Sequence, residues 1–366
     1  MTQHDAKTDD DRAALRSMLF GYYPAQVLQV AARLELADLL AGGPRSAAAL
    51  ASATECDPGS LRRLLRALVV IGILDQSAVV TGEIEPTDDV TGRLDQADPD
   101  AYALTEMGQL LRADHPASMR NYALLFCGEQ VWQSWGDLEY SVRTGKSAWE
   151  RRYGPPFGPG FMTAEFSTIF NAAMAEGTRI AAPAVIAAGE FERFGTVADL
   201  GGGRGILLAA IVAAHPGQRG ILSDLPRALE GAPGVLQAAG VADRCELRPV
   251  DLFAEVPGGA DAYLLKSVIH DWDDDRAGAI LANCRTVMSP AATLMLVEPV
   301  ASDRPSQQAQ YSVSYSDLNM LVCTSGRERT EDEFRQLLTG AGFAVQRITP
   351  CLPTGYSIIE ASPMIT

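Results

Sequence analysis

A glycine-rich segment, Asp199-Leu200-Gly201-Gly202-Gly203-Arg204-Gly205, constrains the fold of this chain more than any other feature. The apolar residues 196–198 precede it and the apolar stretch 206–214 follows it, which is the order of strand, turn and helix. Glycines let the backbone turn tightly and approach a ligand, and the start of the next helix offers free N–H groups. The segment therefore predicts a nucleotide-type cofactor loop at the end of a strand in a parallel sheet.

Two further carboxylates follow apolar runs later in the chain, Asp224 and Asp251. The carboxyl ends of parallel strands meet at one edge of the sheet, where open α/β sheets bind ligands. We expect Asp199 to pair with an ammonium group and Asp224 to accept hydrogen bonds from ribose hydroxyls. Asp251 with Leu252 and Phe253 would frame an adenine ring. Each Asp alone could instead cap a helix, but the loop and the spacing together favour a nucleoside site.

Composition excludes several classes of protein. The 46 acidic residues against 30 Lys and Arg give a net charge of −16, which argues against nucleic-acid and anionic membrane surfaces. No apolar run reaches the length of a membrane span and the polar start, residues 1–12, does not resemble a signal peptide, so we expect a cytoplasmic protein. The six cysteines lack a C-x-x-C pattern and there are four histidines, so we expect reduced thiols and no zinc or other metal site.

The order of apolar patterns predicts four regions. They are a disordered tip over residues 1–12, a mostly helical winged-helix-like dimerisation domain over 13–115, a helical substrate-side region over 116–188, and a Rossmann-like α/β domain over 189–366. The last region is expected to be a doubly wound parallel sheet ending in a hairpin. Its expected strands are 196–200, 220–224, 245–250, 261–267 and 292–297, then 344–350 and 355–360 after a helix at 331–340.

A winged helix raises the possibility of DNA binding through Arg62, Arg63 and Arg66, on the helix that Asp57 and Pro58 would open. The wing expected over residues 81–100 carries seven acidic residues and one Arg, which would repel phosphates. A structural or dimerising role is therefore favoured over a regulator that senses the cofactor and binds DNA.

His270 is the candidate for acid–base chemistry, because it follows an apolar strand at the edge that would carry the ligand. Imidazole has a pKa of about 6.5 and can take up a proton near neutrality. Glu298 ends the next strand and Glu328 precedes the following helix, so either could orient the imidazole and favour its protonated form. The alternative is that His270 only packs or caps and that both glutamates are surface acids.

At these residues the chain resembles the large metal-independent S-adenosylmethionine-dependent O-methyltransferases, the caffeic acid type of plants and its bacterial antibiotic-tailoring relatives. The resemblance spans nearly the whole chain and rests on the glycine loop, Asp224-Leu225, Asp251-Leu252-Phe253, His270-Asp271-Trp272, Glu298-Pro299 and residues 326–330. It implies a homodimer without a metal that uses S-adenosylmethionine, with His270 as the general base flanked by Glu298 and Glu328.

The resemblance also implies the residues that bind each ligand. The cofactor would contact Asp199, Gly201, Gly203, Asp224, Leu225, Asp251, Leu252, Phe253, Lys266 and Thr178. The substrate side would include Met174, Phe170, Trp135, Asp271, Asn319 and Met320. The acceptor is expected to be a phenol or enol of an aromatic or polyketide natural product. An alternative is a relative that keeps the cofactor and performs hydroxylation, decarboxylation or a pericyclic reaction.

Overall fold

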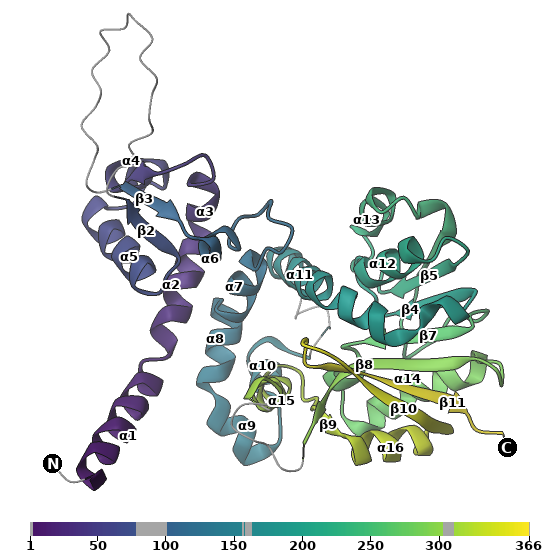
Figure 1. Ribbon diagram of the computed structural model, residues 1–366. Helices are drawn as coiled ribbons and strands as arrows, with labels where there is room; N and C mark the ends of the chain where they lie inside the picture. Colours follow the sequence, from purple (N-terminus) through teal and green to yellow (C-terminus); the bar gives the residue numbers. More distant parts are fainter. Residues whose placement is uncertain (1–2, 78–100, 156, 158–162, 303–310, 366) are drawn as a thin grey trace, which may run out of the picture. The chain divides into compact units, whose positions relative to one another are not determined.

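The structure is a computed structural model that describes residues 3–77, 101–155, 157, 163–302 and 311–365 (Figure 1). The chain divides into two compact units, Met1–Gly128 and Glu129–Thr366. The division falls within the region 116–188 that the sequence assigns to the substrate side. Residues 120–128 belong to unit 1 because α7 (Arg120–Phe126) packs against α2 (Tyr22–Arg33), with Arg120 Nη2 2.7 Å from Glu35 Oε1.

Unit 1 is mostly helical around a small antiparallel sheet of order β1-β3-β2. Its elements are α1 (Gln3–Leu19), α2, α3 (Leu36–Leu39), β1 (Arg45–Ser46), α4 (Ala47–Ala53), α5 (Pro58–Val70), β2 (Leu74–Ser77), β3 (Ala101–Leu104), α6 (Glu106–Gln109) and α7. Asp57 caps α5 as predicted, since its side chain accepts a hydrogen bond from Ser60 N. The buried side chains of Leu50, Leu65 and Tyr102 lie in its core.

The prediction of a disordered tip over residues 1–12 is wrong, because the helix α1 already begins at Gln3. No Gly or Pro occurs before Gly21, so nothing in the local sequence ends a helix there. The acidic segment 81–100 lies outside the described residues.

Unit 2 is built on a sheet of order β10-β11-β8-β7-β4-β5-β6, with β9 paired to β8. The strands from β4 to β8 pair in parallel, and β10 and β11 form the antiparallel hairpin that the sequence predicts. The strands are β4 (Thr196–Leu200), β5 (Arg219–Asp224), β6 (Cys245–Pro249), β7 (Ala262–Lys266), β8 (Thr293–Ala301), β9 (Arg329–Thr330), β10 (Phe343–Cys351) and β11 (Tyr356–Pro363).

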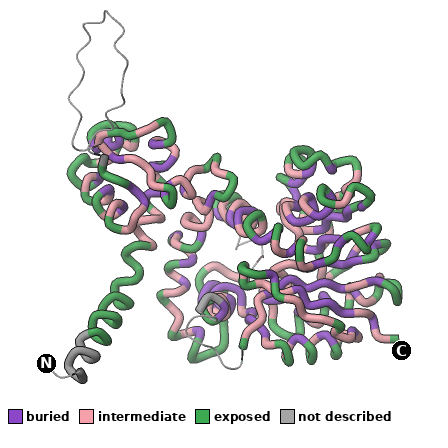
Figure 2. Tube along the Cα trace, in the orientation of Figure 1, coloured by how far each residue is buried: buried purple, intermediate pink, exposed green. Residues whose placement is uncertain are grey.

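The helices of unit 2 are α8 (Glu129–Gly136), α9 (Leu138–Thr144), α10 (Ala148–Tyr153), α11 (Ala164–Gly189), α12 (Ile206–Ala214), α13 (Ala232–Ala238), α14 (Asp274–Val287), α15 (Tyr311–Cys323) and α16 (Glu331–Gly340), with the short 3-10 helices η1 (Phe191–Arg193), η2 (Ala242–Arg244) and η3 (Ile269–Asp271). Of these helices, α11–α13 cover one face of this sheet and α14 and α16 the other, whereas α8–α10 pack against one another and α15 (Figure 1). Val197 faces a core shared with α11 and α12, and Ala198 faces one shared with α14 and α16. Figure 2 shows the buried central strands.

The strand β4 lies between β5 and β7, so the order of the sheet reverses direction at this strand. Ligands of open α/β sheets bind outside the carboxyl ends of the strands at such a switch point. The glycine loop follows β4 directly, and the turn that bears His270 follows β7. The topology therefore brings the two predicted sites to the same edge of the sheet.

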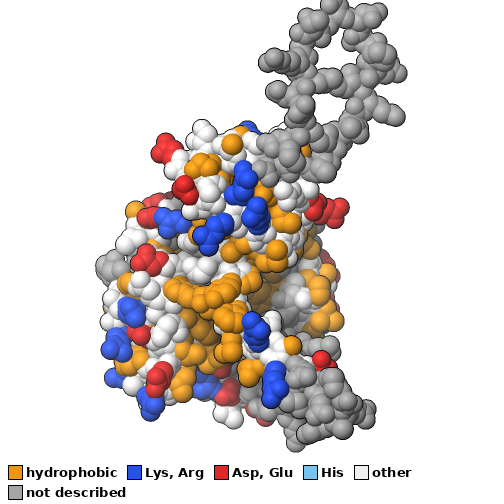
Figure 3. Space-filling model, turned by 90° about the vertical axis from the view of Figure 1, so that its left-hand side faces the viewer, with side chains coloured by type: hydrophobic (Ala, Val, Ile, Leu, Met, Phe, Trp, Pro, Cys, Tyr) orange, Lys and Arg blue, Asp and Glu red, His pale blue; other side chains and the backbone are white. Residues whose placement is uncertain are grey.

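Figure 3 shows exposed apolar side chains in orange. In unit 1 the large exposed ones include Leu15, Met18, Leu19, Phe20, Tyr22 and Tyr23. Within the described part of the chain, no helix is both long and apolar enough to cross a membrane.

Candidate active site

The loop after β4 has the backbone that its glycines predict. Gly201, Gly203 and Gly205 have φ angles of 71°, 56° and 77°, in the left-handed region that favours glycine. A Cβ atom on Gly202 would lie 2.6 Å from the Asp199 carboxylate and 2.5 Å from Leu222 Cδ1. The loop therefore admits no larger residue at Gly202 without moving its neighbours.

Asp199 is buried beneath this loop, with 1% of its surface exposed. Neither carboxylate oxygen has a hydrogen-bond partner among the described residues. Burial, followed by the charge of Asp224, raises the pKa of Asp199 to about 7, while Lys266 lowers it. A buried carboxylate without partners is costly, so the residue fits a ligand with a cationic group such as the ammonium of S-adenosylmethionine.

Asp224 lies against the same loop. Its Oδ2 accepts a hydrogen bond from Gly203 N at 2.8 Å, and its Oδ1 accepts one from Leu225 N at 2.6 Å. Burial raises the pKa of Asp224. These bonds hold the carboxylate at the end of β5, and each oxygen keeps a further lone pair for a ligand hydroxyl.

The third predicted carboxylate is exposed. Asp251 Oδ1 accepts a hydrogen bond from Phe253 N at 2.9 Å, which shapes the turn after β6. Leu252 Cδ1 lies 3.8 Å from the position of a Cβ on Gly201, so this side chain borders the glycine loop. The Phe253 ring packs edge-on against Trp272, with centroids 4.9 Å apart.

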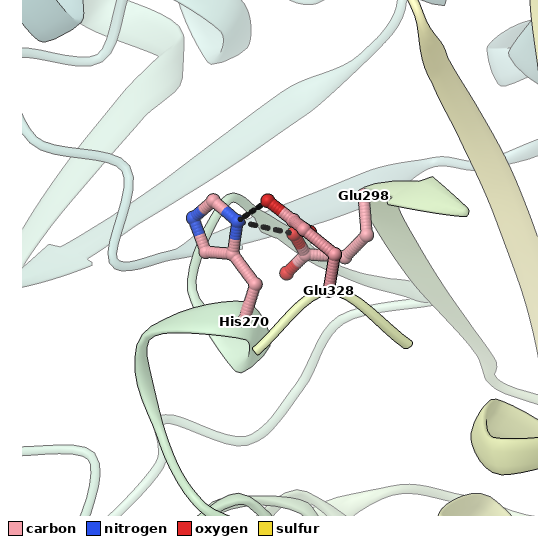
Figure 4. A group of neighbouring side chains, drawn as sticks. All are labelled: His270, Glu298 and Glu328. Carbon is pink, nitrogen blue, oxygen red and sulfur yellow. Dashed lines mark hydrogen bonds and ion pairs between the residues drawn. The ribbon is translucent and has the colours of Figure 1, made fainter. Parts of the chain in front are cut away.

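His270 lies in η3, and its Nδ1 faces two glutamates from distant parts of the chain (Figure 4). Nδ1 donates a hydrogen bond to Glu328 Oε1 at 3.0 Å and lies 3.7 Å from Glu298 Oε2. Glu298 lies within β8, which extends beyond the predicted residue 297 because its end pairs with β9 and β11. Glu328 immediately precedes β9. The structure thus brings the predicted trio together.

Both glutamates are buried and oriented by hydrogen bonds. Glu298 Oε1 accepts from Val268 N at 3.0 Å and from Ile269 N at 2.9 Å. Glu328 Oε1 also accepts from Ser316 Oγ at 2.6 Å. The carboxylates therefore hold the imidazole through Nδ1, which leaves Nε2 to exchange a proton.

The charges of the cluster set the basicity of His270. Burial alone lowers its pKa, but Glu298 and then Glu328 outweigh burial and raise it well above its ordinary value. Asp271 Oδ1 lies 3.9 Å from Nε2, and burial raises the pKa of Asp271 to about 7. The arrangement stabilises the imidazolium that forms when Nε2 takes up a proton.

The remaining predicted residues lie on three helices and one strand of unit 2. Trp135 Nε1 on α8 donates to Asn319 Oδ1 on α15 at 2.9 Å, and Met320 is buried beside Asn319. Phe170, Met174 and Thr178 are half-buried on α11. Their roles in binding stay predictions.

Lys266 ends β7, and its Nζ donates to Ser267 Oγ at 3.2 Å and to Tyr356 OH at 3.4 Å. Sequence reasoning missed Tyr356 because it lies 90 residues from Lys266, on β11, whose pairing with β8 no local pattern predicts. It also missed Ser316, whose contact with Glu328 depends on where α15 packs.

The side chains of His270, Glu298 and Glu328 could also bind a metal ion. One ligand atom each of His270, Glu298 and Glu328 lies within 4.8 Å of the others, which is close enough to hold a metal ion. The expected absence of a metal therefore stays a prediction.

Comparison with known proteins agrees with the two units. Residues 17–114 match the O-methyltransferase dimerisation domain, and residues 135–344 match the O-methyltransferase domain. The chain is 37% identical to phenazine O-methyltransferase PhzM of Lysobacter antibioticus over 96% of each chain.

Two other similarities bear on ligands and reaction. The crystal structure of the O-methyltransferase NcsB1 from neocarzinostatin biosynthesis, in complex with S-adenosylmethionine and 2-hydroxy-5-methyl naphthoic acid, has a TM-score of 0.74 and 30% identity, covering 93% of this chain and 96% of that one. Aclacinomycin 10-hydroxylase RdmB of Streptomyces purpurascens is 32% identical, over 96% of this chain and 91% of its own.

Asp199→Asn should weaken binding of S-adenosylhomocysteine about tenfold or more, because the amide cannot form an ion pair with the ligand ammonium. Wild-type affinity should fall as the pH drops below about 7, since Asp199 then becomes protonated, and the variant should lack this dependence. Isothermal titration calorimetry measures both. Asp261→Asn, at the opposite end of the strands, is the control; equal affinity in Asp199→Asn and wild type would contradict the assignment.

Proposed function

The chain belongs to the O-methyltransferase family, and from this premise we propose that it transfers a methyl group from S-adenosylmethionine to a hydroxyl of an aromatic natural product. The observation that carries the proposal is His270, whose Nδ1 is held by Glu328 at 3.0 Å while Nε2 is left for the acceptor proton. A base in this position suits a phenol or enol, which is mostly neutral at pH 7.

The residues of the two sites divide the work. Asp199 and Asp224 would hold the cofactor at the loop after β4, and when bound it supplies a methyl group already activated by its sulfonium. His270 Nε2 would take the hydroxyl proton of the acceptor as its oxygen attacks. Glu298 and Glu328 stabilise the resulting imidazolium through Nδ1.

Aromatic side chains in unit 2 support an aromatic acceptor. The ring centroid of Phe157 lies 5.5 Å from that of Trp272 and 6.1 Å from that of Phe170. Trp272 follows His270 and Asp271 directly in the chain. Offset and edge-to-face contacts of this kind suit planar rings. The names of the relatives, which include a phenazine and a naphthoic acid, support the same class of acceptor.

We also propose that the protein is a homodimer. Its residues 17–114 match a dimerisation domain, and six large apolar side chains between residues 15 and 23 are exposed. Burial of such side chains against a second copy would remove them from water.

His270→Ala should lose most methyl transfer, about a hundredfold or more, because it removes the imidazole nitrogen that would take up the acceptor proton. Binding of S-adenosylhomocysteine should stay within about twofold of wild type. Transfer of labelled methyl to a panel of hydroxylated aromatic compounds measures the first, with His115→Ala as the control. Wild-type rates in His270→Ala would refute the assignment, and acceptor conversion without label would favour the hydroxylase-like alternative.

Glu328→Gln should shift the acid limb of the pH profile of kcat/KM to lower pH. Activity requires unprotonated Nε2, and the charge of Glu328 raises the pKa of His270, so its removal lowers the pH at which the base becomes available. The maximal rate should fall, since the base is weaker. Glu331→Gln, an exposed residue nearby, is the control; an unchanged limb or one at higher pH would contradict this prediction.

Removal of metal ions should leave methyl transfer unchanged if the cluster acts as a base. His270 Nδ1 donates its hydrogen bond to Glu328 Oε1, so this nitrogen offers no lone pair to a metal, although Oε2 of Glu298 and of Glu328 has no hydrogen-bond partner among the described residues. Activity measured after dialysis against EDTA, with and without added divalent cations, tests this. Loss of activity that a cation restores would show a metal-dependent reaction.

A further inference from the structure

The residue after Glu328 is a fully buried arginine that the reaction described above does not use. Arg329 has 0% of its surface exposed and lies in β9, where it pairs with Val300 of β8. We infer that Arg329 is a positioning residue for His270, because its guanidinium holds the backbone turn that presents the imidazole. This inference rests on the proposed role of His270 as the base.

The guanidinium binds carbonyl groups on both sides of His270. Arg329 Nη1 donates to Ile269 O at 3.1 Å, and Nη2 donates to Trp272 O at 2.8 Å. The carbonyl of His270 itself accepts from Arg327 N at 2.9 Å. Three hydrogen bonds from Arg327 and Arg329 thus fix the carbonyl side of η3.

The N–H side of the same turn is held by Glu298, which accepts from Val268 N and Ile269 N. The turn needs such support because it leaves β7 through Ser267, a non-glycine residue with a φ angle of 53°. A 3-10 helix of three residues also has little hydrogen bonding of its own. Glu298 and Arg329 therefore hold opposite polar sides of the turn.

Asp274 orients the guanidinium. Its Oδ1 accepts from Arg329 Nε at 2.9 Å and from Nη2 at 2.8 Å, and its side chain is 59% exposed at the start of α14. A planar guanidinium can bind one carboxylate and two carbonyls at once, which a lysine ammonium cannot reproduce in the same geometry. A Cβ on Gly326 would lie 2.0 Å from His270 O, so the segment fits closely against the turn.

Asp274→Ala tests the inference without removing a buried group. Its kcat should fall about fivefold or more, while KM for donor and acceptor stays within about twofold, because positioning of the base affects the chemical step. Asp275→Ala is the matched control, since this neighbour is also exposed in the first turn of α14. Equal kcat values for Asp274→Ala and Asp275→Ala would count against the inference.

Arg329→Lys should lower kcat about a hundredfold and leave S-adenosylhomocysteine binding within about twofold. In a His270→Ala background the same change should lower residual transfer by no more than about twofold, because Arg329 acts through His270. A full additional loss in that background, or wild-type kcat in Arg329→Lys, would overturn the inference. If Arg329→Lys does not fold, Asp274→Ala decides.

The outcomes also separate the two proposals. Wild-type rates in His270→Ala would overturn the proposed function and this inference together. An inactive His270→Ala with wild-type kcat in both Asp274→Ala and Arg329→Lys would overturn the inference alone.

Discussion

Burial of the His270, Glu298 and Glu328 side chains together is the constraint on which the site depends. Charged groups removed from water need partners, and here each partner comes from a different element. Glu298 binds the backbone of the turn after β7, and Glu328 binds Ser316 of α15. The need to satisfy two carboxylates thereby ties β8, η3, α15 and the segment before β9 into one arrangement around the imidazole.

The carboxylates beside His270 and the carboxylate beneath the glycine loop differ in their hydrogen-bond partners. Glu298 and Glu328 each bind groups of the chain, so the imidazole is oriented before any ligand arrives. Asp199 has no hydrogen-bond partner among the described residues, and its pKa is raised to about 7. A preorganised imidazole and a carboxylate that fits a cationic ligand thus lie at neighbouring strands, because β4 pairs with β7.

Local patterns predicted much of this arrangement. The glycine loop, the cap at Asp57 and the alternation of strands and helices depend on residues close in sequence, and these agree with the structure. The prediction of a disordered tip over residues 1–12 was wrong. It rested on the polar composition of this segment, although the segment contains no Gly or Pro to end a helix. Tyr356, Ser316 and the contacts of Arg329 escaped prediction, since each depends on the packing of elements distant in sequence.

The sequence by itself determined the fold class, the position of the glycine loop and the candidates His270, Glu298 and Glu328, because periodicity and strand ends are local properties of the chain. Only the tertiary structure decided that both glutamates face Nδ1, that Asp199 lacks a hydrogen-bond partner among the described residues and that Arg329 binds the turn around His270. The physical reason is that hydrogen bonds and burial depend on distances between elements, and sheet order and helix packing set those distances.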